Sequence, residues 1–267
     1  MDLGFSGAKA VVTGGSKGMG LAIAETLGAE GASVAIMARG ESALEAAAER
    51  IRAAGAPEVL PLSVDMADAG SIAAGYASVQ SAWGTINALV HTVGPGAGSF
   101  EELDDDDWHA AFDLGTLSAV RSVRAALPML RGAEWARIVT LSAHSIQRQS
   151  ARLVAYTATK AALSSFTKNL SKSLGPEGIL VNCICPGTIV TASFTEILKD
   201  VLAADGLNSA DPHDVMTWVE RTYGHPCDLG RAGLPEEIAS AAAYLASRRN
   251  GYVTGATVNV DGGSDFI

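Results

Sequence analysis

The chain has few basic residues, few cysteines and no long apolar run, and each shortage excludes a class of protein. Lys and Arg number 19 against 29 Asp and Glu, which gives a formal net charge of −10. Nucleic-acid-binding surfaces are basic, so no nucleic-acid partner is expected, and an anionic membrane surface is disfavoured for the same reason. A small anionic ligand is still compatible, because a helix N-terminus binds phosphate even in an acidic protein.

The three cysteines are Cys183, Cys185 and Cys227. Their odd number, without a Cys-x-x-C pair, predicts a reduced, cytoplasmic chain rather than a disulfide framework. His225 lies two residues before Cys227, but no second cluster stands at ligand spacing, so no metal site is expected. No apolar run reaches the ~18 residues of a membrane span, and Asp2 is not followed by a basic region, so no signal peptide is expected.

Strand-like and helix-like patterns alternate along the whole chain. Short apolar and β-branched runs predict strands at 8–14, 33–38, 58–64, 86–94, 136–143, 179–187 and 256–263. Apolar residues at helical spacing predict helices at 19–31, 42–55, 69–82, 106–130, 151–174 and 235–247. This alternation predicts one α/β domain over 1–267, a doubly wound, Rossmann-type and mostly parallel sheet of seven strands with helices on both faces. The segment 188–230 has a poor pattern and is predicted to be a substrate loop, or lid.

A glycine-rich turn joins the first predicted strand to the first helix. The stretch VVTGGSKGMG places Gly14, Gly18 and Gly20 there. Without bulky side chains, a pyrophosphate can reach the backbone N–H groups at the helix N-terminus. The position after a strand and before a helix is the context that such a motif requires. The turn therefore predicts dinucleotide binding, and the alternative is a tight strand-to-helix turn that binds nothing.

The end of the second predicted strand indicates which dinucleotide binds. NAD enzymes hold the ribose 2′-hydroxyl with an acidic residue at this point, but this chain has Arg39. A guanidinium favours a 2′-phosphate, and Lys17 in the glycine-rich turn adds a second positive charge. NADP is therefore expected in preference to NAD, with a surface cation as the alternative interpretation of Arg39. Asp65, after the third strand, is expected near the adenine.

Tyr156 and Lys160 lie one turn apart on a predicted helix, in the stretch LSAHSIQRQSARLVAYTATKAA. A free tyrosine titrates near ~10, and a nearby ammonium group favours its ionised form. Such a pair can protonate a carbonyl oxygen or deprotonate an alcohol. The alternative is two unrelated surface residues on a helix.

These pieces together resemble the classical short-chain dehydrogenase/reductase family over almost the full length of the chain. The resemblance rests on TGGSKGMG, on Tyr156-x-x-x-Lys160, and on VNCICPGTIVT and GYVTGATVNVDGG near the C-terminus. It implies that Tyr156 is the general acid-base and Lys160 its electrostatic partner, and that a homotetramer or homodimer forms through the helices at 106–130 and 151–174. It also implies cofactor contacts at Ser16, Met19, Met66, Thr92, Gly94, Pro186, Gly187, Ile189 and Thr191.

The chain departs from the family at three positions. His91 begins the segment where the family has Asn-Asn-Ala-Gly, Gly115 stands where the family often has an asparagine, and Ala143 stands where it has the substrate-orienting serine. In an extended chain Ser145 faces the same side as Ala143 and Ser142 faces the other. Ser145 is therefore the preferred catalytic serine. Ser142 remains an alternative, as does His144 or a residue of 188–230.

These features predict an oxidoreductase that interconverts a ketone and a secondary alcohol. With NADPH, the expected reaction is reduction of a small-molecule, 3-oxoacyl-like ketone. Phe194, Leu198, Met216 and Trp218 in the 188–230 segment suggest an apolar or bulky substrate, with packing of this segment on the body of the protein as an equal alternative. One alternative is a dinucleotide-binding sensor or scaffold subunit with little turnover, motivated by the three departures. Another is an NAD-dependent dehydrogenase.

Overall fold

A seven-stranded parallel sheet forms the centre of the molecule, with the strand order β3-β2-β1-β4-β5-β6-β7. The computed structural model describes residues 2–264. Every strand lies inside a segment predicted from the sequence, so the parallel sheet is confirmed. The strands are β1 Lys9–Thr13, β2 Ser33–Ala38, β3 Val59–Ser63, β4 Ala88–His91, β5 Ala136–Leu141, β6 Ile179–Pro186 and β7 Thr257–Val260.

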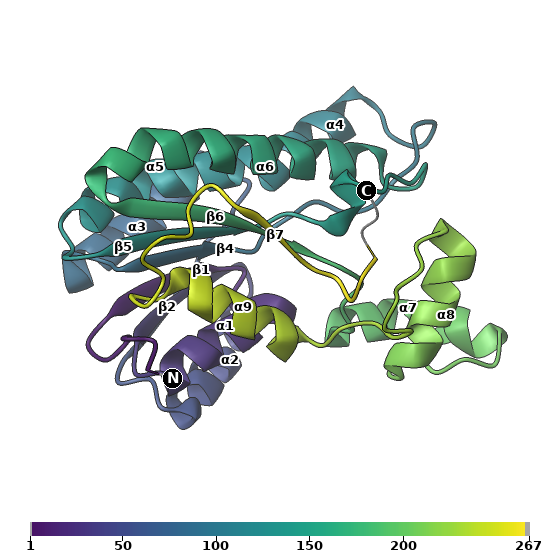
Figure 1. Cartoon of the computed structure of the whole chain (residues 1–267), viewed down its shortest axis with the longest axis horizontal. Coiled ribbons are helices and arrows are strands. Elements are labelled where there is room, and N and C mark those ends of the chain that lie inside the picture. The colour runs from purple at the N-terminus through teal and green to yellow at the C-terminus, as the bar shows by residue number, and fades with distance from the viewer. Residues whose placement is uncertain (1, 265–267) are drawn as a thin grey trace.

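Helices cover both faces of the sheet, as Figure 1 shows. Each face has its own cluster of buried apolar residues, because strands buried on both sides need a helical layer on each. One layer holds α1 Gly18–Ala29, α2 Glu41–Ala54 and α9 Pro235–Ala246, and the other holds α3 Ala69–Trp83, α5 Ser118–Arg131 and α6 Val154–Leu174. The doubly wound architecture is therefore confirmed.

The strand order reverses between β1 and β4, which are neighbours although β2 and β3 separate them in the sequence. Such a switch point opens a crevice outside the carboxyl ends of the strands, where ligands of this fold class bind. The loops that follow β1, β4, β5 and β6 all start at this edge, because the strands are parallel. The glycine-rich turn, the serines and the segment after Pro186 are thus brought to one side of the sheet.

The predicted helix over 106–130 is interrupted. It consists of α4 Asp105–Phe112, a π-helical turn at Asp113–Leu117, and then α5. The turn contains Gly115, where a Cβ atom would lie 2.5 Å from Thr159 Oγ1 on α6. The absent side chain lets the two helices pack closely at this point. The acidic run before the turn caps α4, since Asp104 and Asp107 bond to each other's backbone N–H groups in a capping box.

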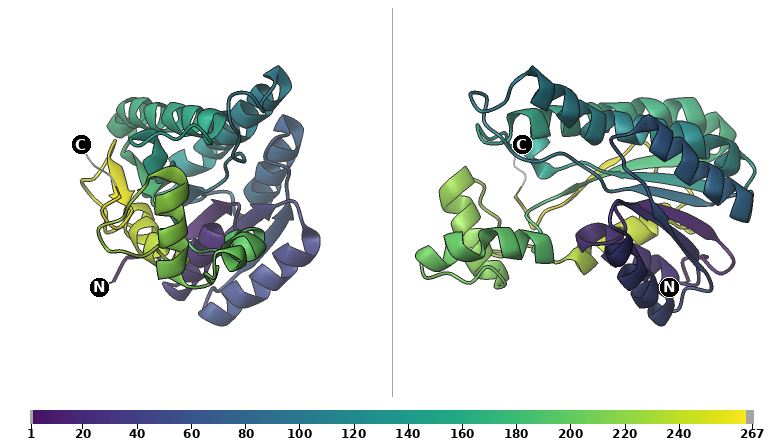
Figure 2. Two further views of the ribbon diagram at one scale, coloured as in Figure 1. Left: turned by 90° about the vertical axis from the view of Figure 1, so that its right-hand side faces the viewer. Right: turned by 180° about the vertical axis from the view of Figure 1, so that it is seen from behind.

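The segment 188–230 is not the irregular loop that its composition suggests. It contains α7 Ala192–Ala204 and α8 Pro212–Tyr223, which lie beyond the carboxyl ends of the strands (Figures 1 and 2). Thr191 and Asp211 accept hydrogen bonds from the first turns of these helices and thereby cap them. The two helices share a small core built from Leu198, Leu202, Val215, Met216, Val219 and Ala232. That this segment acts as a lid stays a prediction.

Candidate active site

The glycine-rich turn leaves the N-terminus of α1 accessible to an anion. Gly14 and Gly18 have φ angles of 73° and 52°, in the left-handed region that favours glycine. A Cβ atom on Gly18 would lie 3.2 Å from Thr191 Cγ2, so the turn faces the segment after β6. The first turn of α1 has no acidic residue, and no side chain caps it. These features fit a dinucleotide pyrophosphate held by backbone N–H groups, with Ser16, Met19 and Gly20 in the same turn.

The two basic residues predicted to select the 2′-phosphate lie on the surface beside this turn. Lys17 is the N-cap residue of α1, and Arg39 directly follows β2. Both side chains are exposed, and neither forms an ion pair within residues 2–264. Their charges therefore remain available to a phosphate group. Asp65 is exposed after β3, and Met66 next to it is buried.

The remaining predicted cofactor residues line the loops after β4 and β6. Thr92 donates a hydrogen bond to the Thr13 carbonyl at 2.6 Å and thus ties β4 to β1. Ile189 is buried and forms an isolated parallel bridge with Gly233. Gly94 leaves room for the Lys160 side chain, because a Cβ atom added at Gly94 would lie 2.8 Å from Lys160 Nζ. The same side of the sheet also carries Pro186, Gly187 and Thr191.

Tyr156 and Lys160 lie in the first two turns of α6. The Lys160 ammonium donates hydrogen bonds to the Val93 carbonyl at 3.0 Å and to the Leu141 carbonyl at 2.7 Å. Its Nζ lies 6.0 Å from the centroid of the Tyr156 ring. The lysine is thus fixed between the ends of β4 and β5, with its charge beside the tyrosine.

Burial dominates the protonation of this pair. It raises the pKa of Tyr156 to about 12, with a smaller contribution from the neighbouring Cys185. It lowers the pKa of Lys160 to about 8, because the charged form loses its solvation. The sequence predicted a lowered tyrosine pKa beside the ammonium, whereas desolvation raises it. At neutral pH both groups carry their protons, so the tyrosine is poised to donate one.

The structure distinguishes the two candidate serines by their hydrogen bonds. Ser142 donates to the Lys160 backbone carbonyl at 2.8 Å, so its proton is already used within the fold. Ser145 instead accepts from the Thr157 hydroxyl at 3.2 Å, which leaves its own proton without an acceptor among residues 2–264. Both serines are buried and line the same cavity as Tyr156. Only Ser145 has a proton to offer a substrate oxygen.

His91, the last residue of β4, is buried and hydrogen-bonded through both ring nitrogens. Thr13 Oγ1 lies 2.9 Å from its Nδ1, and Ser118 Oγ lies 3.1 Å from its Nε2. Ser118 donates its proton to the Leu114 carbonyl, so its oxygen accepts from Nε2–H, and Thr13 donates to Nδ1. The neutral imidazole thus bridges β1 and α5. Burial, and then the nearby Lys160 charge, lower the pKa of His91 to about 3.

A cavity of about 360 Å³ is lined both by residues predicted to bind the cofactor and by the predicted catalytic residues. Met19 and Thr191 line it beside Tyr156, so a dinucleotide and a substrate can meet there. Sequence reasoning missed several wall residues, because only the tertiary fold brings them together. Those outside the earlier predictions are Ala97, Leu153, Thr188, Val219, Tyr223 and His225. Phe194, which the sequence suggested for substrate binding, also lines the wall, whereas Leu198, Met216 and Trp218 pack within the α7–α8 pair.

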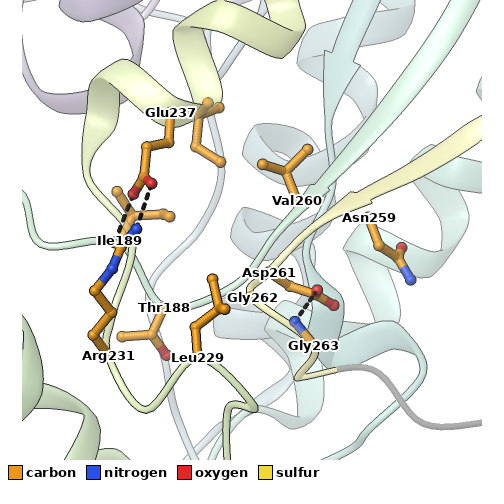
Figure 3. A pocket seen from close by; sticks show the side chains of 12 residues that line it. Thr188, Ile189, Leu229, Arg231, Glu237, Asn259, Val260, Asp261, Gly262 and Gly263 are labelled. Atoms are coloured by element: carbon orange, nitrogen blue, oxygen red, sulfur yellow. Dashed lines mark hydrogen bonds and ion pairs between the residues drawn. The ribbon is translucent and has the colours of Figure 1, made fainter.

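A second cavity of about 330 Å³ shares Thr188 and Ile189 with the first, and Figure 3 shows the residues that line it. Arg231 and Glu237 form an ion pair of 2.7 Å at its wall, and Asp261 accepts a hydrogen bond from the Gly263 backbone. Ile189 lines both cavities, and the segment around it is held by hydrogen bonds from the Gly233 N–H to the Thr188 carbonyl at 2.8 Å and from the Val190 N–H to the Gly233 carbonyl at 2.9 Å. Within residues 2–264 no group of three His, Cys, Asp or Glu side chains is arranged to hold a metal ion, and no helix is long and apolar enough to cross a membrane.

Comparisons with known proteins find relatives that are similar to this chain in sequence and in structure. A family model described as Enoyl-(Acyl carrier protein) reductase matches residues 14–265. The 3-oxoacyl-acyl-carrier-protein reductase FabG of Chlamydia muridarum is 34% identical over 257 residues, 95% of this chain and 96% of that protein. The short-chain reductase protein NovJ of Streptomyces niveus is 32% identical over 255 residues, 95% of this chain and 92% of NovJ. The structure of L-sorbose reductase from Gluconobacter frateurii, complexed with NADPH and L-sorbose, superposes with a TM-score of 0.91 at 32% identity and covers 99% of this chain and 98% of that one.

Proposed function

This chain belongs to the short-chain dehydrogenase/reductase family, and from that premise we infer that it is an NADPH-dependent oxidoreductase that interconverts a ketone and a secondary alcohol. Reduction of a 3-oxoacyl-like or other small-molecule ketone is the reaction that the FabG, NovJ and sorbose reductase relatives support. The observation that carries the proposal is the meeting of Tyr156, Ser145 and the cofactor-loop residues Met19 and Thr191 around one cavity.

NADPH, when bound, supplies the hydride that reduces the carbonyl carbon. The backbone N–H groups after Gly14 and at the start of α1 hold its pyrophosphate, and Arg39 and Lys17 hold its 2′-phosphate. The turn and the two cations bind the cofactor and orient it toward the cavity. Orientation of this kind is a large part of the rate enhancement.

In the proposed mechanism, Tyr156 donates its phenolic proton to the ketone oxygen. Its raised pKa, about 12, keeps it protonated at neutral pH, which suits an acid in the reductive direction. Ser145 donates a second hydrogen bond to the same oxygen and so places the carbonyl against the tyrosine. Lys160, fixed by the carbonyls of Val93 and Leu141, stabilises the negative charge that develops on the tyrosine oxygen.

The proposal is tested by titrating the protein with NADPH and with NADH while tryptophan fluorescence is followed, and then by screening ketones for NADPH oxidation. Tighter binding of NADPH and ketone-dependent oxidation are expected. Tighter binding of NADH would contradict the assignment of Arg39 and Lys17. Binding without turnover of any ketone would favour the sensor alternative, which none of the named relatives supports.

We further propose a cytoplasmic homotetramer, or a homodimer, that assembles through α5 and α6. Phe112 and Leu117, at the start of this layer, leave 37% and 40% of their surface exposed, which favours burial against another copy. The thiols of Cys183 and Cys185 are free and buried, as suits a reducing compartment. Mass measurement in solution tests the assembly.

A further inference from the structure

Thr157 is a helical residue whose hydroxyl group bonds outside its own helix. Serine and threonine side chains inside a helix can donate to the backbone carbonyl one turn back. Thr167 on α6 does so, with its Oγ1 2.8 Å from the Leu163 carbonyl oxygen. Thr157 instead donates to Ser145 Oγ at 3.2 Å. This bond joins the beginning of α6 to the short turn after β5 that carries the predicted catalytic serine.

The two hydroxyl groups differ in their access to the active-site cavity. Both residues are buried, but Ser145 lines the cavity and Thr157 does not. Thr157 therefore acts on the serine rather than on a substrate. In the low dielectric of a protein interior, hydrogen bonds in a chain polarise one another. An oxygen that accepts from Thr157 is thereby made a stronger donor through its own proton.

The direction of this hydrogen bond also restricts where the Ser145 proton can point. A hydroxyl group has one proton and two acceptor positions on its oxygen. Thr157 occupies one acceptor position, so the proton of Ser145 points away from Thr157. That proton has no acceptor among residues 2–264, and a carbonyl oxygen in the cavity can supply one. Ser145 is thus prepared as a donor before the substrate binds.

We propose that Thr157 is a positioning residue, which holds Ser145 as the hydrogen-bond donor to the carbonyl oxygen of the substrate. The inference rests on the proposed reductase function and adds a residue that acts through Ser145. Tyr156 and Thr157 are consecutive, so the same part of α6 supplies the phenolic proton directly and supports the second hydrogen bond through the serine. The contact also fixes the serine two residues beyond Ala143, the position where the family has it.

The test measures kcat and KM for the NADPH-dependent reduction of ethyl acetoacetate, a 3-oxo ester, or of the fastest ketone in the screen if this ester is inert. Thr157→Val removes the hydroxyl group but keeps a side chain of similar shape. The value of kcat/KM is expected to fall roughly 2- to 10-fold, the effect of one hydrogen bond. The Kd for NADPH should not change, because Ser145 serves the substrate oxygen. Thr157→Ser keeps the donor and is expected to retain most of the activity.

Thr167→Val is the matched control. It also removes a buried hydroxyl group from α6, one that bonds to Leu163 and Thr140, and none of these three residues lines the cavity. Its kcat/KM is therefore expected to stay at the wild-type value. Thermal unfolding of both valine variants shows whether any loss of activity follows from a loss of stability.

A double-mutant cycle separates positioning from a purely structural role. If Thr157 acts through Ser145, then Thr157→Val should change kcat/KM by less than about 2-fold in the Ser145→Ala background. The same loss with and without the serine, wild-type activity in Thr157→Val, or equal losses in Thr157→Val and Thr157→Ser overturns the inference while the reductase function stands. Absence of NADPH oxidation with every ketone overturns both.

Discussion

At the scale of single residues, the hydroxyl of Tyr156 carries the proposed chemistry. Tyr156→Phe removes the proton donor but keeps the ring, so kcat is expected to fall by about 10²–10⁴-fold. NADPH affinity should change little, because the phenylalanine ring fills the same space. Steady-state NADPH oxidation and fluorescence titration measure the two effects separately. A variant that retains wild-type kcat would exclude Tyr156 as the acid.

Arg39 is expected to decide between the two dinucleotides. Arg39→Ser removes a charge-assisted contact to the 2′-phosphate, so the Kd for NADPH should rise on the order of 10- to 100-fold, while the Kd for NADH stays constant. Arg52→Ser is the control, because Arg52 is an exposed cation in the last turn of α2, away from the glycine-rich turn. Equal weakening in both variants would mean that general charge, not a specific contact, attracts the cofactor.

The sequence predicts the cofactor side of the candidate site better than its substrate side. Gly14 and Gly18 act through the local backbone, so their spacing alone indicates a turn that admits a phosphate. His144 and His225 are 81 residues apart and meet only because α8 returns to the end of β5. From the sequence alone, Ser142 and Ser145 remained alternatives. Their hydrogen-bond partners lie elsewhere in the chain, and those partners determine which hydroxyl has a free proton.

At the scale of elements, His91 ties β1, β4 and α5 together and makes stability depend on pH. An unfolded histidine titrates near 6.5, whereas folding lowers the pKa of His91 to about 3. The unfolded state therefore binds the proton first, and the contribution is complete above about pH 6.5. Below that pH, the free energy of unfolding should fall by up to about 1.4 kcal/mol per pH unit from this residue.

Urea unfolding between pH 5 and 8 measures this slope. His91→Asn keeps a polar side chain but removes the titration, so the pH dependence should become shallower by about that amount. An unchanged slope in the variant would assign the effect to other groups.

Gly115 sets the approach of the interrupted α4–α5 segment to α6. In Gly115→Ala the new Cβ atom would lie 2.5 Å from Thr159 Oγ1 and 2.7 Å from Thr159 Cβ. Overpacking of this kind costs about 1–3 kcal/mol, more than the gain of about 1 kcal/mol in helix propensity. A lower Tm is therefore expected by calorimetry. Gly175→Ala is the control, since its Cβ atom meets nothing within 4 Å among residues 2–264, and its Tm should not fall.

The elements themselves follow from local patterns, and the exceptions have tertiary causes. The strands and their covering helices are predictable because buried parallel strands read as continuous apolar runs. The close packing at Gly115 involves Thr159 in another helix, which no local window contains. In 188–230, the many polar and turn-forming residues obscure α7 and α8, although the caps Thr191 and Asp211 are visible in the sequence.

At the scale of the whole molecule, the exposed apolar side chains near α5 make the proposed assembly testable. Leu117→Glu places a charge on the surface that the proposed interface would bury, so the subunit number should drop at micromolar concentration. Ile197→Glu is the matched control, because Ile197 is 74% exposed and belongs to α7, a helix that lies apart from α5 and α6 in Figure 1. Light scattering after size-exclusion chromatography measures both masses. A monomeric wild type, or an equal loss of mass in the two variants, would contradict assembly through this layer.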